Sequence, residues 1–245
     1  MAAKSGSLRP HEVRQSYARP RPQKSVPGEP ELGDSFLIVT EGEVTEELYF
    51  ESLRTTLQLG PVTVQVVHPR FTHAEGLVRA AMSRYDKDKQ GRRMAKEASG
   101  NRGVEWFDHV WVLFDTDVPA QQGQLDRAMT LAREEDIHVG WSTPSIEVWL
   151  LLHFRDRPGP ILESKNGERL LRDAWGQRYD KNASTFSQLW KAIKPTIPVA
   201  VERGQQIREY HKNANTPFPP DPSTQLDLLV RALNASVQPP MRILP

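Results

Sequence analysis

Four acidic residues stand at, or shortly after, the ends of short apolar runs. They are Glu41, Asp115, Asp117 and Glu147. The runs cover residues 35–40, 109–114 and 137–141, and each has the length and composition of a β-strand. Ligands of open α/β sheets bind outside the carboxyl ends of the strands. The sequence therefore predicts that these carboxylates meet at one edge of a sheet.

Carboxylates gathered in this way favour a divalent cation. Asp115 and Asp117 are two residues apart, so in an extended segment they point to the same side. At 4 Å and an effective dielectric constant of 20, each pair of carboxylates repels by about 4 kcal/mol. With oxygen ligands alone, the expected ion is Mg²⁺ or Mn²⁺. Such an ion can orient a water and stabilise the charge on a phosphate during in-line attack.

Each acid also has a structural explanation. An acid after a strand is often a turn residue or a helix cap. Glu46 and Glu147 fall in first helical turns, where the helix dipole alone accounts for them, and for Glu46 we favour that explanation. Glu41 is neither a good cap nor a turn former. Acids at three strand ends are therefore stronger evidence for a functional site than any one acid alone.

The elements that must position these acids alternate between strand and helix. A further strand is expected at residues 62–67. Helical patterns are expected at 45–57, 74–89, 124–135 and 146–154. This alternation predicts an α/β fold with a mostly parallel sheet flanked by helices. After Arg155 the strand patterns stop, and helices are expected at 167–175, 185–193, 199–213 and 223–235.

Three regions follow from this pattern. Residues 1–33 are rich in Pro, Ser, Gly and isolated basic residues, which predicts a flexible basic arm. Residues 34–155 form the expected catalytic domain, and residues 156–245 the helical C-terminal region packed on it. The arm is either a plain tail or a contact for phosphates, and the sequence leaves both interpretations open.

The overall composition excludes several classes of protein. The chain has 245 residues, no cysteine and a net charge of +1. Disulfides and cysteine-ligated zinc are excluded, which suits a cytoplasmic protein. No apolar run approaches the roughly 20 residues of a membrane helix, and residues 1–33 lack the apolar core of a secretory signal. We find no P-loop, Gly-x-Gly-x-x-Gly or zinc spacing.

Because the net charge is small, any attraction to nucleic acid must come from local basic groups. Candidates for such contacts are Arg84, Lys87, Arg92, Arg93, Lys96, Arg178 and Lys181. A solvated surface is the default interpretation of all of them. A patch that follows the phosphate backbone is the alternative for the set between residues 84 and 102.

Four blocks of the sequence resemble the RloB-like family. The first is FLIVTEGEVTE at residues 36–46, and the second is the Asp-x-Asp at residues 114–117. The third, residues 142–154, has a Ser-x-Pro, a Glu and an apolar helix, and the fourth is the Pro-Ser-Thr at residues 222–224. Their order and spacing agree with the family. The sequence has Asp221 where the resemblance leads us to expect Asn, and Thr116 between the two acids.

This resemblance implies a fold related to Toprim and a part in bacterial defence against phage. It implies that Glu41 is a general acid/base and that Asp115 and Asp117 bind Mg²⁺. Glu147 belongs to the RloB-like pattern rather than to Toprim domains in general. Some family members are encoded beside an ATPase, so the resemblance also implies an ATPase partner.

The expected function is that of a Mg²⁺-dependent endonuclease acting on RNA, with tRNA among the candidates, or on DNA. Glu41, Asp115, Asp117 and Glu147 are its expected catalytic and metal-binding residues. The alternative is a non-catalytic adaptor that binds nucleic acid or a partner protein. The sequence leaves open whether the chain forms a homo-oligomer.

Overall fold

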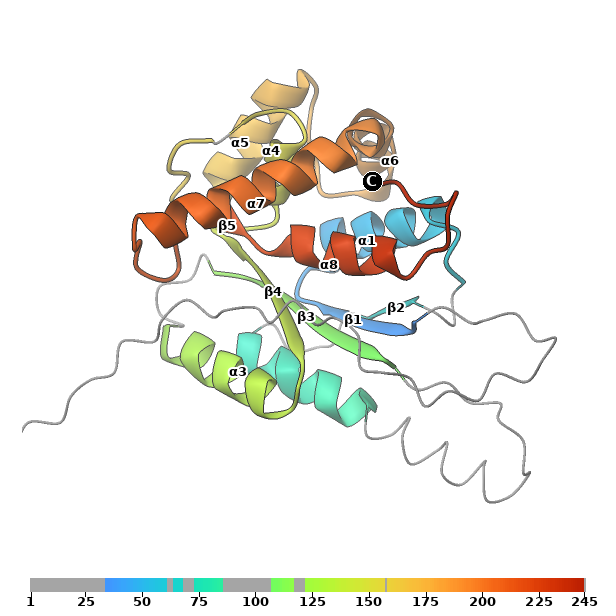
Figure 1. Ribbon diagram of the computed structural model, residues 1–245. Helices are drawn as coiled ribbons and strands as arrows, with labels where there is room; N and C mark the ends of the chain where they lie inside the picture. The colour runs from blue at the N-terminus through green and yellow to red at the C-terminus, as the bar shows by residue number, and fades with distance from the viewer. Residues whose placement is uncertain are drawn as a thin grey trace, which may run out of the picture.

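The computed structural model describes residues 34–60, 64–67, 73–85, 107–116, 122–156 and 158–244. Its centre is a sheet of five strands in the order β2-β1-β3-β4-β5 (Figure 1). The strands are β1 (Phe36–Thr40), β2 (Val64–Val67), β3 (His109–Asp115), β4 (His138–Thr143) and β5 (Ser223–Thr224). The first four are parallel, and β5 runs antiparallel to β4. The predicted α/β fold with a mostly parallel sheet is confirmed.

The central strands are buried on both faces, as continuous apolar runs predict. All five residues of β1 are buried, as are six of the seven in β3. Neighbours along β1 supply opposite faces, since Phe36 and Ile38 join one core cluster and Leu37 and Val39 the other. The sheet therefore separates two hydrophobic layers.

One layer is thin. It is covered by the helix at residues 74–85 and by α3 (Gln122–Glu134), which lie together on the lower side of the sheet in Figure 1. Both helices pack apolar side chains such as Leu77 and Leu125 against the strands. No described helix is long and apolar enough to cross a membrane.

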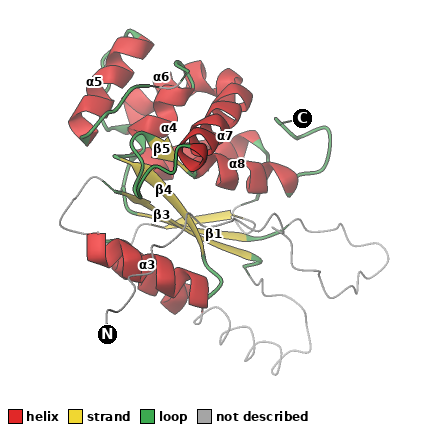
Figure 2. Ribbon diagram, turned by 60° about the vertical axis from the view of Figure 1, so that its left-hand side comes forward, coloured by secondary structure: helices red, strands yellow, loops and turns green. Residues whose placement is uncertain are grey.

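The other layer holds most of the helices in the described parts of the chain (Figure 2). It contains α1 (Thr45–Thr56), α4 (Glu147–Leu152), α5 (Ser164–Trp175), α6 (Ala183–Ile193), the short 3-10 helix η2 (Lys194–Thr196), α7 (Ile197–Asn213) and α8 (Leu226–Ala235). One core cluster includes residues from Phe36 in β1 to Leu244 near the end of the chain. The predicted helical C-terminal region is thus present and packs on the sheet.

The strand β5 is a correction to the sequence analysis, which expected residues 223–235 to be one helix. Ser223 and Thr224 instead extend the sheet, and α8 begins at Leu226. The Thr224 hydroxyl lies 2.9 Å from the Ser142 hydroxyl, and the N–H of Gln225 donates to the Trp141 carbonyl. A strand of two residues is too short to give a periodic pattern.

A buried ion pair joins α7 and α8. Asp227 is fully buried and accepts hydrogen bonds from two nitrogens of Arg208, at 3.1 and 2.5 Å. A Cβ at Gly204 would lie 3.1 Å from the Asp227 side chain, so glycine permits this close approach. Burial raises the pKa of Asp227, and the charge of Arg208 opposes that shift.

Candidate functional site

The ends of β1 and β3 lie side by side and bring two of the predicted acids together. Glu41 follows β1, and its backbone N–H donates to the Leu113 carbonyl, continuing the ladder. The Glu41 carboxylate accepts a hydrogen bond of 2.9 Å from the N–H of Asp115, the last residue of β3. Glu41 and Asp115 therefore share one place at the carboxyl edge of the sheet, as the strand order requires.

A third acid, Glu46, lies against Gly42, the residue that follows Glu41. Its carboxylate covers the backbone of Gly42, so closely that a Cβ at position 42 would lie under 3.0 Å from it. Glu46 is buried in the first turn of α1. Burial raises the pKa of Glu46, the negative charge of Glu147 adds to that shift, and the positive charge of Lys181 opposes it. Sequence reasoning assigned Glu46 to the helix dipole and did not anticipate this burial.

Glu147 begins α4 and has no exposed surface. One of its carboxylate oxygens accepts a 2.6 Å hydrogen bond from the Ser145 hydroxyl. The other accepts one from the Tyr179 hydroxyl and lies 3.1 Å from the ammonium of Lys181. A buried carboxylate needs such partners, because the loss of water is otherwise very costly.

Lys181 is the positive charge of this cluster. Its ammonium lies between Glu147 and Glu168 of α5, at 3.1 and 3.2 Å. Burial acts to lower the pKa of Lys181, but the two glutamates outweigh it and raise the pKa. The sequence analysis considered Lys181 as a phosphate contact, whereas in this structure its charge faces the acidic cluster. Arg178, from the same stretch, is exposed and pairs with Asp180 at 2.8 Å.

Tyr179 connects the two helices that begin at the sheet edge. Its single hydroxyl proton is donated to Glu147, so at the 3.2 Å contact with Thr45 the threonine hydroxyl must be the donor. Thr45 opens α1, and Glu147 opens α4. Burial, followed by the charge of Glu147, raises the pKa of Tyr179, so its hydroxyl stays protonated.

The turn between β4 and α4 is tied to the end of β3. The N–H of Thr116 donates to the carbonyls of Ser142 and Pro144, each at 3.0 Å. The Thr116 hydroxyl donates to that of Thr143 at 2.7 Å. The threonine between the two predicted aspartates therefore has a structural use, which is to hold the neighbouring strand end.

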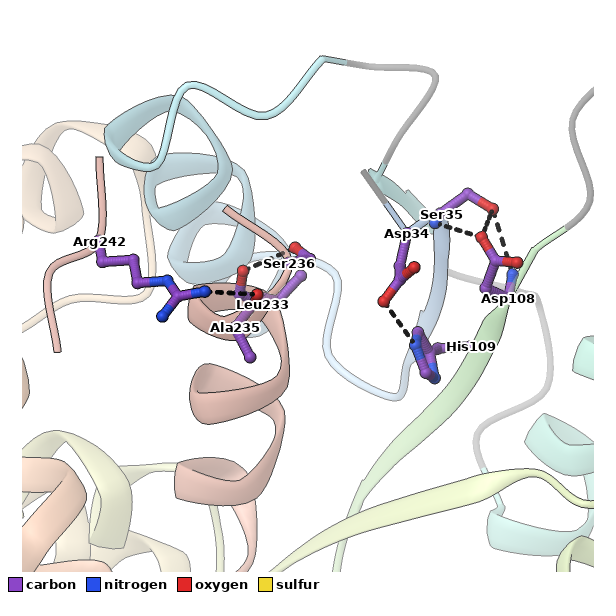
Figure 3. Close-up of polar contacts among 8 residues, drawn as sticks. All are labelled: Asp34, Ser35, Asp108, His109, Leu233, Ala235, Ser236 and Arg242. Atoms are coloured by element: carbon purple, nitrogen blue, oxygen red, sulfur yellow. Dashed lines mark hydrogen bonds and ion pairs between the residues drawn. The ribbon is translucent and has the colours of Figure 1, made fainter. Parts of the chain in front are cut away.

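A separate polar cluster lies at the amino-terminal ends of the strands, opposite the carboxyl ends, and is shown in Figure 3. One oxygen of Asp108 accepts from the N–H and the hydroxyl of Ser35, and His109 lies 3.4 Å from Asp34. These residues stand at the amino ends of β1 and β3. They connect the two strands at that edge and are separate from the site around Glu41.

Several predicted site residues lie outside the described parts of the chain. They are Asp117, Lys87, Arg92, Arg93 and Lys96, together with the arm at residues 1–33. Arg84 is described and donates to the Gln65 side chain at 3.2 Å. Within the described ranges, no three or more His, Asp or Glu residues are grouped so that they could hold a metal ion. Glu41 and Asp115 meet through the Glu41 carboxylate and the Asp115 N–H, and Glu147 is engaged by Ser145, Tyr179 and Lys181.

Comparison with known proteins gives one result. No curated protein and no solved structure matches the chain. The model of the RloB-like protein family matches residues 36–233, a stretch that runs from the first residue of β1 to near the end of α8. Because this match covers most of the 245 residues, the chain belongs to the RloB-like protein family.

Proposed function

We propose that this protein is a metal-dependent nuclease that hydrolyses phosphodiester bonds in RNA or DNA. The observation that supports the proposal is the hydrogen bond between the Glu41 carboxylate and the N–H of Asp115. It brings two acids from neighbouring parallel strands to the edge where α/β proteins bind ligands. The resemblance to Toprim domains, where acids in these places serve phosphoryl chemistry, agrees with it.

The donor set suits a hard divalent cation. Glu41 and Asp115 offer carboxylate oxygens at adjacent strand ends, and Asp117 follows two residues later. Oxygen ligands of this kind are those that Mg²⁺ and Mn²⁺ prefer. When bound, the ion would neutralise the phosphate and orient the attacking water. We assign its binding to these three acids, and we place Glu147 beside them as an organising residue.

Glu41 is the candidate for proton transfer. The N–H of Asp115 donates to one of its carboxylate oxygens and so fixes the side chain at the end of β1. In the proposed reaction a water oxygen forms a bond to phosphorus while the bond to the leaving oxygen breaks. Glu41 accepts the proton of the attacking water or donates one to the leaving oxygen.

Basic side chains would hold the nucleic-acid backbone. Arg84 and Arg178 are candidates among the described residues, and Lys87, Arg92, Arg93, Lys96 and the basic arm are candidates outside them. Such contacts give affinity without reading sequence. The proposal includes a cytoplasmic role in defence against phage, tRNA as one RNA substrate, and an ATPase partner.

A second candidate function is a non-catalytic adaptor that binds nucleic acid or a partner protein. One observation favours it, namely that Glu147, one of the four predicted metal ligands, is engaged within the fold by Ser145, Tyr179 and Lys181. Under this alternative the acids at the strand ends only organise the fold. A folded Glu41→Gln variant that still protects cells from phage would favour the adaptor over the nuclease.

The nuclease proposal is tested by incubating the purified full chain with tRNA, mRNA and plasmid DNA. Each substrate is offered with Mg²⁺, with Mn²⁺ and with EDTA. We expect cleavage with a metal ion, none in EDTA, and none by Glu41→Gln. The matched control is Glu43→Gln, an exposed glutamate two residues away. Cleavage that persists in EDTA would contradict the mechanism.

A further inference from the structure

Tyr179 belongs to the connection between α5 and α6, far in sequence from the acids at the sheet edge. Even so, its side chain is buried, with a relative exposure of 5%. Its hydroxyl stands between Thr45 of α1 and Glu147 of α4. It is thus one of the places where the C-terminal region reaches residues close to the strand ends.

From Thr45 the connection leads to Glu41. The next residue, Glu46, places its carboxylate against Gly42, which directly follows Glu41. Thr45 and Glu46 are both buried, so the start of α1 is held firmly against this turn. Any displacement of Thr45 would move the turn that carries Glu41.

From Glu147 a second connection leads to Asp115. Ser145 donates to Glu147, and the preceding Pro144 accepts from the N–H of Thr116, the residue after Asp115. The hydrogen bond from Asp115 to Glu41 then joins the two connections. Together they form a closed ring of contacts around the carboxyl edge, and Tyr179 is the member supplied by the C-terminal region.

Other contacts hold Tyr179 and Glu147 in this ring. Lys181, two residues after Tyr179, balances the buried charge of Glu147 and also binds Glu168 of α5. Gly167 of α5 brings its backbone so close to Glu147 that a Cβ there would lie 3.0 Å from the Glu147 Cβ. The α5–α6 connection is therefore packed and paired against the start of α4.

We propose that Tyr179 is a positioning residue for the Glu41–Asp115 pair, acting through Thr45 and Glu147. The inference rests on the proposed nuclease function for its catalytic consequence, while its structural consequence is independent of it. The C-terminal helices then do more than cover the sheet, because they set the geometry of the acids. Misplacing a reacting group by about 1 Å can cost roughly 100-fold in rate.

The structural consequence is measured by hydrogen exchange in the metal-free full chain. Tyr179→Phe removes the hydroxyl and keeps the ring, and Thr45→Val removes only the partner hydroxyl. We expect amide exchange in residues 41–46 and 113–116 to rise roughly tenfold or more in Tyr179→Phe, which loses a hydrogen bond to the charged Glu147, and roughly two- to tenfold in Thr45→Val, which loses a neutral one. The matched control is Tyr210→Phe, since Tyr210 is exposed on α7 and should leave exchange unchanged.

The catalytic consequence is a split between kcat and KM. We expect Tyr179→Phe to lower kcat roughly 10- to 100-fold at an unchanged KM for nucleic acid, because it misplaces acids without removing a substrate contact. Lys181→Met should also lower kcat, and Lys181→Arg, which keeps the positive charge, should retain most of the wild-type kcat. A general loss of stability would not be relieved selectively by the conservative variant.

The outcomes separate the two proposals. Wild-type exchange rates at residues 41–46 and 113–116 in folded Tyr179→Phe or Thr45→Val would overturn the positioning role, whatever the cleavage assay shows. Faster exchange in these variants, with no cleavage by the wild-type protein, would overturn the nuclease function and leave the positioning of the two acids supported. A drop in kcat with faster exchange supports both.

Discussion

The carboxylate of Glu46 lies against the backbone of Gly42, in the space that any larger residue at position 42 would need. Gly42→Ala therefore forces Glu46 away from its place or moves the turn after Glu41. Because only the end of the Glu46 side chain must shift, although it is buried, we predict a loss of stability of about 1 kcal/mol, the low end for overpacking, and a clear loss of cleavage activity. Denaturant unfolding and a cleavage assay measure the two effects.

Gly159→Ala is the matched control for that substitution. Gly159 has nothing within 4 Å of an added Cβ, so the same change there should alter stability by less than about 0.5 kcal/mol. If Gly42→Ala behaves like Gly159→Ala in both assays, Glu46 does not occupy the position described.

The burial of His153 predicts that the free energy of unfolding decreases at low pH. It is buried beside Trp149 and donates to the Ile193 carbonyl. Burial lowers the pKa of His153 to about 3; the bond to Ile193 opposes this shift, and the charge of Arg203 adds to it. An unfolded histidine keeps its ordinary pKa of 6.5, so the unfolded state binds the proton first. The stabilisation is complete above pH 6.5 and is lost as the pH falls toward 3.

By pH 5 this effect alone costs about 2 kcal/mol of unfolding free energy. His153→Asn keeps a donor for Ile193 but does not titrate, so its stability should fall less between pH 7 and pH 5. Parallel curves for wild type and His153→Asn would contradict the buried neutral state.

The ion pair between α7 and α8 gives a third prediction. Arg208→Met leaves the fully buried Asp227 without its main partner, and removing one member of a buried pair costs about 3–5 kcal/mol. The deficit should be larger at pH 8 than at pH 5. Burial without Arg208 raises the pKa of Asp227 further, and a raised pKa gives stability that is present at low pH and lost as pH rises.

Urea unfolding at the two pH values measures this deficit. Arg172→Met, at an exposed position of α5, serves as the control and should change stability by less than about 0.5 kcal/mol. If Arg208→Met loses no more stability than this control, another group or water must compensate the buried charge of Asp227.

The sequence predicted an element correctly where the residues of that element alone were sufficient to identify it. The apolar runs before Glu41 and Asp115 predicted β1 and β3, and parallel pairing then required that the two acids meet. The two-residue β5 was missed because its contacts come from Trp141 and Ser142, some 80 residues earlier. A local sequence pattern contains no information about pairing between residues so far apart.

The partners of Glu147 could not be predicted for the same reason. Tyr179 and Lys181 lie in a polar connection that resembles any solvated loop. Only the packing of α5 against α4 turns them toward the buried carboxylate. The sequence does place a glycine, Gly42, four residues before Glu46. That the Glu46 carboxylate packs against this glycine becomes evident only in the folded turn.

Binding of Mn²⁺, followed by electron paramagnetic resonance, tests most directly whether Glu41 and Asp115 together hold a cation. The wild-type protein should bind the ion, and Glu41→Gln and Asp115→Asn should each weaken binding by roughly tenfold or more. Glu43→Gln should bind as the wild type does. If both site variants fold and bind Mn²⁺ as tightly as the wild-type protein, the account of a metal site at the ends of β1 and β3 is contradicted.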